Sequence, residues 1–310
     1  MPKFANGAWS KATALSTAAF AAAALTSCDT EQGASPEATP QVVTTFSVLA
    51  DMTAEIGGDR IEVQSITPVG AEVHEYDPAP ADIQAVTDAD LVIENGLNLE
   101  EWFEQFIAHS DAPVVTASEG IEVQEVTGLP NHPDGAQGLP EDPHGWISPV
   151  QAITYIDNIE AGLAELSPED AEYFAERADE YRQQLTELAE QAQDRAAELD
   201  ADYLVTCEGA FGYLARDLGL SEHYLWPLNA ENEGTPQQVE AQIDFVEDNG
   251  VETIFCESTV NDDAQAQVAE STGAELAGPL YVDSLTEDGD ADTYLQLLEY
   301  TIDTILSSHE

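Results

Sequence analysis

Short segments rich in apolar and β-branched residues recur along this chain, and longer segments with helical spacing separate them. In the first half the short segments are 42–48, 63–66, 91–93 and 114–116, and in the second half they are 203–206, 223–226, 253–255 and 275–276. Strands that are apolar on both faces and alternate with helices, such as those expected at 80–89 and 100–108, are typical of parallel sheets covered on each side. The sequence therefore predicts an α/β fold.

A long segment without glycine lies between the two groups of strands. It begins at Ser167 and Pro168, which are typical of a helix start, and it is expected to continue for roughly 30 residues. Its apolar residues recur at three- and four-residue steps: Phe174, Ala178, Tyr181, Leu185, Leu188 and Ala192. We therefore expect two pseudo-symmetric α/β lobes, at 42–166 and 200–310, joined by one long, rigid helix at 167–199.

Residues 1–27 have the pattern of a signal peptide. The only two lysines of the chain precede an apolar run at 12–25, which is too short to span a bilayer. The run ends in Leu25-Thr26-Ser27-Cys28, which resembles a bacterial lipobox and implies cleavage before Cys28 and a lipid on its sulfur. The alternative is an ordinary secreted protein with an incidental cysteine. The polar stretch 28–41 is expected to be a flexible tether.

The chain is strongly acidic, with 62 Asp and Glu against 7 Lys and Arg and a formal net charge of −55. Nucleic acid is excluded as a partner, because binding to phosphates needs a basic surface. Most of the acids are expected to form a hydrated surface. Their mutual repulsion destabilises a compact state at low ionic strength, and salt screens that repulsion, so we expect the protein to function in a salty setting or in one that disfavours lysine for another reason.

Two histidines and two carboxylates, His74, His144, Glu208 and Asp283, end four similar stretches of the chain. In open α/β sheets, ligands bind outside the carboxyl ends of the strands, and the expected strand at 203–206 leads to Glu208, two residues beyond its end. Two imidazoles and two carboxylates can replace the water shell of a divalent transition ion. None of the four is convincing alone, because most lone histidines in loops are simply solvated.

These segments resemble the metal-binding lipoproteins of bacterial ABC uptake systems, the manganese- and zinc-type solute-binding family. The resemblance covers nearly all of 41–310. The stretches that carry it are Val73-His74-Glu75-Tyr76-Asp77-Pro78, Asn95-Gly96-Leu97-Asn98-Leu99-Glu100, Asp142-Pro143-His144-Gly145-Trp146, Glu208-Gly209-Ala210-Phe211, Glu233-Gly234-Thr235-Pro236 and Asp283-Ser284-Leu285. Any one of these would be weak, whereas together, in this order and spacing, they are specific.

The resemblance implies a metal ion in the cleft between the two lobes, with His74 and His144 as ligands from the first lobe and Glu208 and Asp283 from the second. It implies a binding protein rather than an enzyme. The protein would be held by its lipid at the outer face of the cytoplasmic membrane, and an ABC permease with its ATPase would be its partners.

The donor set indicates which metal to expect. Zinc-type members of the family tend to carry a third histidine where Glu208 stands, and a histidine-rich loop before His144, where this chain has only His132 among several acids. Two carboxylates make a harder site that suits Mn²⁺, and also Fe²⁺, better than a closed tetrahedral zinc site. Zn²⁺ remains an alternative, because raw affinity follows the Irving–Williams order.

Two cysteines, Cys207 and Cys256, depart from the family pattern, and each follows an expected strand. If those strands are neighbours, the sulfurs could form a disulfide, which is chemically plausible outside the cytoplasm. Two buried thiols are the alternative. A Cys207 thiolate beside Glu208 could also bind the metal, and would then favour zinc.

Other classes of function use similar residues. A metal-dependent hydrolase could hold a catalytic ion with the same four side chains, but the chain has no His-Glu-x-x-His motif and no evident separate base near the ligands. A surface adhesin stiffened by its metal is a further alternative. A siderophore or corrinoid carrier would need a wide cleft, and four converging ligands favour a bare ion instead.

Overall fold

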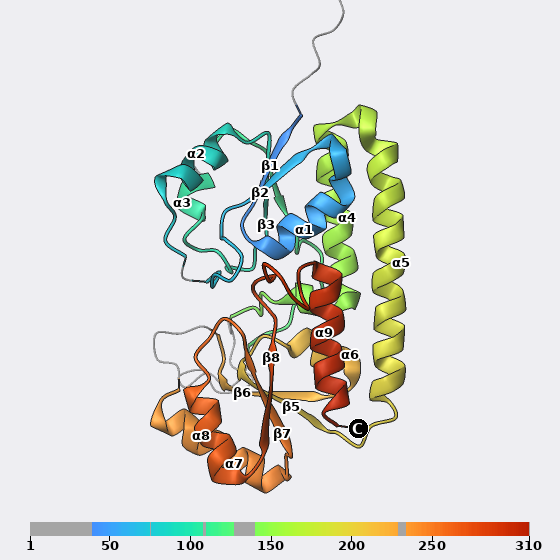
Figure 1. Cartoon of the computed structure of the whole chain (residues 1–310). Coiled ribbons are helices and arrows are strands. Elements are labelled where there is room, and N and C mark those ends of the chain that lie inside the picture. The colour runs from blue at the N-terminus through green and yellow to red at the C-terminus, as the bar shows by residue number, and fades with distance from the viewer. Residues whose placement is uncertain (1–38, 75, 108–109, 127–139, 229–233, 310) are drawn as a thin grey trace, which may run out of the picture. The chain divides into compact units, whose positions relative to one another are not determined.

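The computed structural model describes residues 39–74, 76–107, 110–126, 140–228 and 234–309 (Figure 1). The expected signal peptide, the lipidation residue Cys28, most of the tether and His132 lie outside the described residues. Within the described part of the chain, no helix combines the length and the apolar character needed to cross a membrane.

The first lobe is built on a parallel sheet in the order β2-β1-β3-β4. Its strands are β1 (Gln41–Thr44), β2 (Glu62–Ser65), β3 (Leu91–Glu94) and β4 (Val114–Thr116). Its helices are α1 (Ser47–Gly57), α2 (Pro80–Asp88), α3 (Glu104–Ile107) and α4 (Pro149–Leu166). Successive residues of β1 face opposite cores, because Val42 packs in the core with α1 and α4 and Val43 packs in the one with α2. Helices therefore cover both faces of the sheet, as the sequence predicts.

The apolar segment 42–48 is not one strand, contrary to expectation. β1 ends at Thr44, and α1 begins at Ser47. The first turn of α1 is buried as fully as β1, with Val48 at 0% exposure. A buried strand and a buried helical turn have the same apolar composition, so the sequence pattern does not separate them.

The helix expected at 100–108 is also much shorter, since α3 has only four residues and turns precede it. Two residues of these turns, Leu97 and Asn98, are left-handed, with φ of 56° and 61°. The buried side chain of Glu100 turns inward and accepts a hydrogen bond from the backbone N–H of Asn95. These contacts hold the segment as a loop rather than as a helix.

The second lobe repeats the strand order of the first. Its strands are β5 (Tyr203–Glu208), β6 (Ser221–Trp226), β7 (Thr253–Glu257) and β8 (Glu275–Leu280). β5 pairs with β6 and β7 pairs with β8, both in parallel, and β5 lies beside β7. The four strands thus form two two-stranded sheets, β5-β6 and β7-β8, and their spatial order β6-β5-β7-β8 corresponds to β2-β1-β3-β4. The helices are α6 (Gly212–Leu218), α7 (Pro236–Asn249), α8 (Asp263–Thr272) and α9 (Tyr294–Ser307).

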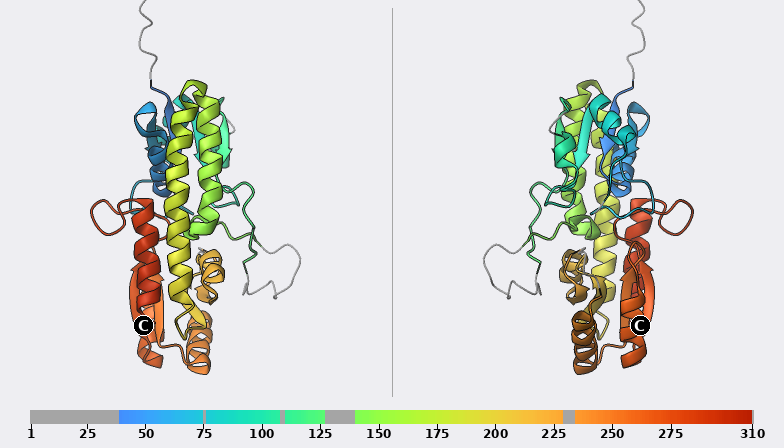
Figure 2. Two further views of the ribbon diagram at one scale, coloured as in Figure 1. Left: turned by 90° about the vertical axis from the view of Figure 1, so that its right-hand side faces the viewer. Right: turned by 90° about the vertical axis from the view of Figure 1, so that its left-hand side faces the viewer.

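A single long helix, α5 (Ala171–Ala196), connects the two lobes and runs beside both (Figures 1 and 2). A 3₁₀ turn at Pro168–Asp170 precedes it, and at 1.5 Å per residue its length is roughly 39 Å. It contacts α1 and α4 of the first lobe and α6 and α9 of the second. One continuous hydrophobic core, which includes Phe174, Tyr181 and Leu185 of α5, extends through both lobes. The lobes therefore share a core along this helix.

Candidate metal site

Each of the four candidate ligands lies at the end of a strand or in a loop between a strand and a helix. His74 lies in the loop after β2, and His144 directly precedes the 3₁₀ turn η2 (Gly145–Ile147) that leads into α4. Glu208 is the last residue of β5, and Asp283 follows the end of β8 by three residues. All four thus follow the carboxyl end of a strand or lie in a loop on that side, two in each lobe.

The side chains converge. The Nε2 atoms of His74 and His144 are 3.2 Å apart. Glu208 Oε1 lies 3.6 Å from Nε2 of His74 and 4.0 Å from Nε2 of His144. One ligand atom from each of His74, His144 and Asp283 lies within 4.8 Å of the others. Glu208 and Asp283 thus each lie close to the histidine pair, which supplies two nitrogen donors.

The site is deeply buried. The side chain of His74 is 12% exposed, those of His144 and Glu208 are 0% and 1% exposed, and Asp283 is 1% exposed. Burial and the neighbouring His144 hold the pKa of His74 well below its usual range. Burial raises the pKa of Asp283 to about 6, although His144 opposes that rise. His74 is therefore neutral at physiological pH, which is the form that binds metals.

His144 is oriented by Asp142, whose role the sequence did not reveal. Asp142 Oδ1 lies 2.8 Å from Nδ1 of His144 and also accepts the His144 backbone N–H at 3.0 Å. A proton on Nδ1 donates to this carboxylate, which leaves the lone pair of Nε2 directed at His74. A carboxylate that holds the far nitrogen of a ligating imidazole is a common support in metal sites. The sequence signal was the adjacency of Asp142 and His144 in one motif.

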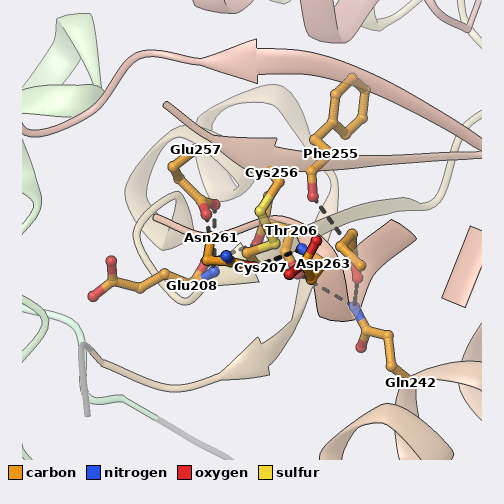
Figure 3. The surroundings of a disulfide bond; sticks show 10 residues. Thr206, Cys207, Glu208, Gln242, Phe255, Cys256, Glu257, Asn261 and Asp263 are labelled. Atoms are coloured by element: carbon orange, nitrogen blue, oxygen red, sulfur yellow. Dashed lines mark hydrogen bonds between the residues drawn. A yellow bond between two sulfur atoms is a disulfide. The ribbon is translucent and has the colours of Figure 1, made fainter. Parts of the chain in front are cut away.

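Asp283 and Glu208 are restrained by different contacts, one at the side chain and one at the backbone. Thr259 donates a hydrogen bond to Asp283 Oδ2 at 3.2 Å. Asp283 Oδ1 is buried and has no hydrogen-bond partner among the described residues. The backbone N–H of Glu208 donates to the carboxyl group of Glu257, 3.3 Å from each of its oxygens, while the Glu208 side chain extends away (Figure 3). Neither Thr259 nor Glu257 was identified from the sequence.

The sulfurs of Cys207 and Cys256 form a disulfide between β5 and β7, with Cα atoms 4.9 Å apart (Figure 3). The disulfide is one of the three possibilities that the sequence left open. The two cysteines occupy neighbouring strands immediately before Glu208 and Glu257, so the disulfide ties the strand that carries Glu208 to its neighbour. As disulfide sulfurs they are not thiolates, and in this state they cannot supply a metal ligand.

The chain is similar to known metal-binding proteins over most of its length. The family model of ZnuA, the periplasmic component A of a zinc-uptake complex, matches residues 42–308. The iron-binding protein YfeA of Yersinia pestis is 43% identical over 269 residues, which cover 86% of this chain and 85% of that protein. The manganese-binding lipoprotein MntA of Halalkalibacterium halodurans is 34% identical over 271 residues, which cover 86% of this chain and 87% of that protein.

A solved structure supports the same relationship. The Mn-bound periplasmic metal binding protein from Candidatus Liberibacter asiaticus matches with a TM-score of 0.80 and 32% identity, and the match covers 87% of this chain and 100% of that one. The expected parallel α/β fold is thereby confirmed. Sequence, fold and site agree that the chain belongs to the ZnuA family, the metal-binding substrate-binding proteins of ABC transport systems.

Proposed function

We propose that this protein captures Mn²⁺ outside the cytoplasm through His74, His144, Glu208 and Asp283, and delivers the ion to an ABC permease and its ATPase. The observation that supports this proposal most directly is the convergence of the four side chains from two lobes. An ion bound by all four would contact both lobes at once, so its capture and release would be coupled to the relative position of the lobes.

The spacing of the donors fits an ion. Around a metal with bonds of about 2.1 Å, neighbouring donors lie roughly 3.0–3.4 Å apart. The 3.2 Å between the two Nε2 atoms falls in that range, and the 3.6 Å and 4.0 Å to Glu208 need only a small contraction. Asp283 Oδ1, buried without a hydrogen-bond partner among the described residues, would gain the metal as its partner.

The choice of Mn²⁺ rests on the chemistry of the donors. Two carboxylates, each able to bind through one or two oxygens, allow more than four bonds to the ion, and oxygen ligands suit Mn²⁺. Fe²⁺ is the second candidate, because the relative that is 43% identical is named an iron-binding protein. Zn²⁺ should bind at least as tightly in vitro, so selectivity would depend on geometry, on metal supply or on release to the permease.

The N-terminal segment suggests how the protein is placed. The relatives include a lipoprotein and periplasmic proteins. We propose that Cys28 carries a lipid that holds the protein at the outer face of the cytoplasmic membrane. Labelled palmitate should be incorporated into the wild-type protein and not into Cys28→Ala, and labelling of the variant would contradict the assignment.

The ligand assignment is tested by titrating metal-free protein with Mn²⁺ in a calorimeter. His74→Ala and Asp283→Ala should each lower the affinity by roughly 100-fold or more, because each removes a direct ligand. His223→Ala is the matched control, since His223 hydrogen-bonds to Gln242 and stacks on Phe245 outside the site. Unchanged Mn²⁺ binding in both ligand variants would refute the proposal.

The physiological ion can be identified separately. Anomalous scattering from crystals of protein purified without added metal should show manganese at the four side chains. An anomalous signal from iron or zinc at the same position would support the proposed ligands but would show that Mn²⁺ is not the physiological ion.

A further inference from the structure

Three of the four proposed ligands share a local feature: the carbonyl oxygen of the residue before the ligand accepts a hydrogen bond from a side-chain N–H. The three bonds are Trp102 Nε1 to Val73 O at 2.7 Å, before His74; Asn95 Nδ2 to Pro143 O at 3.0 Å, before His144; and Trp146 Nε1 to Val282 O at 3.0 Å, before Asp283. Fixing that carbonyl fixes the peptide plane that leads into the ligand, and so restrains the direction of its Cα–Cβ bond.

Two of the three donors belong to one loop. Asn95 and Trp102 lie in the segment between β3 and α3, of which only the part from Glu100 onward was expected to be helical. Through these two donors, one loop restrains the backbone immediately before His74 and before His144, although the two histidines are far apart in the sequence. The stretch from Asn95 to Glu100 is one of the motifs that resemble the family, and no role was assigned to it from the sequence. Its hydrogen bonds to the segments that carry the histidines suggest one.

The loop is itself held firmly. Oε1 of the buried Glu100 accepts hydrogen bonds from the backbone N–H of Asn95 at 2.7 Å and from the Thr45 hydroxyl at 2.6 Å. The hydroxyl of Tyr155 donates to Asn95 Oδ1 at 2.9 Å, which leaves the amide nitrogen directed at Pro143. Consecutive left-handed residues at Leu97 and Asn98 cost free energy, and such strain persists only where the surroundings enforce it.

The third donor connects the lobes. Trp146 is fully buried, lies two residues after His144, and reaches Val282 in the second lobe. Its ring packs edge-on against Phe46, with centroids 5.0 Å apart, and its own carbonyl accepts a hydrogen bond from the Tyr294 hydroxyl. Trp146 therefore ties the segment of one first-lobe ligand to the segment of a second-lobe ligand.

We propose that Trp102, Asn95 and Trp146 are positioning residues that set the ligand geometry of the metal site by holding these three carbonyls. The proposal rests on the proposed function, because it takes His74, His144 and Asp283 as ligands. Residues that orient metal ligands typically change the affinity by 10- to 100-fold when they are replaced. When such supporting contacts are lost, the ligands remain present but their geometry becomes less precise.

The test replaces each indole N–H without removing the aromatic ring. Trp102→Phe and Trp146→Phe are compared with Trp226→Phe, a matched control, since Trp226 is buried but its Nε1 has no hydrogen-bond partner among the described residues. We expect Mn²⁺ affinity to fall about 10- to 100-fold in the first two variants and to stay within about twofold in the control. The electron paramagnetic resonance spectrum of bound Mn²⁺ should broaden in the first two only, because the coordination becomes less uniform.

Asn95→Asp is the second probe, because it keeps the acceptor for Tyr155 and removes the donor to Pro143. The urea midpoint of each metal-free variant separates lost stability from lost affinity. If the three variants bind Mn²⁺ as tightly as Trp226→Phe and give the wild-type spectrum, the positioning proposal is wrong, even if they are less stable. Loss of binding in His74→Ala and Asp283→Ala alongside that result would leave the proposed function intact, whereas unchanged binding in both of these ligand variants would refute the proposed function.

Discussion

His74 and His144 are 70 residues apart in the chain, yet their Nε2 atoms face each other at 3.2 Å. Which of the two nitrogens donates across this contact depends on the tautomer of each ring, and two charged rings would repel each other. Burial and His144 already hold the pKa of His74 well below its usual range. Binding of one divalent cation by both Nε2 atoms, as proposed above, requires the proton of each neutral ring to lie on Nδ1.

Replacing Asp142 by Asn should weaken metal binding without weakening the fold. Asn keeps an oxygen that can accept from His144, but it removes the negative charge that makes Nε2 a stronger donor, so Mn²⁺ affinity should fall about 10-fold. Burial and then the Asp142 charge raise the pKa of Glu222 well above its usual value, so removing that charge relieves a repulsion. Calorimetry and urea unfolding measure the two effects.

Glu222→Gln is the matched control for Asp142→Asn. Glu222 accepts a hydrogen bond from the backbone N–H of Phe211 and, within the described part of the chain, forms no hydrogen bond with a proposed ligand, so Mn²⁺ affinity should stay at the wild-type value. An equal loss of affinity in both variants would show that the charge of Asp142 does not act through His144.

Stability should depend on pH through Glu100. Burial raises the pKa of Glu100 from 4.5 in the unfolded chain to about 7 in the folded protein. The folded state therefore binds more protons than the unfolded state between these values, and its contribution to the free energy of unfolding falls as pH rises from about 4.5 to about 7. The total is on the order of 3 kcal/mol. Glu100→Gln keeps the acceptor for Asn95 and Thr45 and removes this titration.

Urea unfolding of wild type and Glu100→Gln at several pH values checks this expectation. The variant should gain stability relative to wild type as pH rises from 5 to about 7. A constant difference across that interval would mean that Glu100 does not titrate differently in the two states.

Removing the disulfide should lower the free energy of unfolding. Cys207 and Cys256 close a loop of 49 residues, for which the entropy of the unfolded chain gives a stabilisation of about 4 kcal/mol, with 2–4 kcal/mol typical. The double variant Cys207→Ala and Cys256→Ala should unfold at a lower urea concentration than oxidised wild type. Reduced wild type should resemble the variant, and a variant as stable as oxidised wild type would contradict the expectation.

Neutral salt should stabilise the protein. The chain has 62 acids, and its five arginines all lie within the described residues, where each pairs with a carboxylate, as Arg177 does with Glu55. Salt weakens those few pairs, but it screens the much more numerous repulsions between acids, so the second effect dominates. The melting temperature should rise by several degrees between about 0.05 M and about 1 M sodium chloride. A melting temperature that stayed constant or fell would contradict this balance.

Much of the fold follows from local pattern. Apolar segments such as 91–93 and 253–255 predict buried strands because their composition suits both faces of a covered sheet, and both are strands in the structure. The stripe along α5 predicts its buried face for the same reason, except that Ala189 is buried where Leu188 was expected to be. The metal-binding family was identified from motifs, each of which is contiguous in the sequence.

Other features depended on contacts that no local pattern encodes. Whether 42–48 forms one strand or a strand and a helical turn depended on how the segment packs, because both are equally apolar. The hydrogen bonds from Trp102 to Val73 and from Trp146 to Val282 join residues 29 and 136 positions apart. The candidate ligands could be identified from the sequence, because each lies within a short contiguous motif. Only the packed chain decides what orients them, because the partners of a buried polar group are chosen by proximity in three dimensions and not by neighbourhood in sequence.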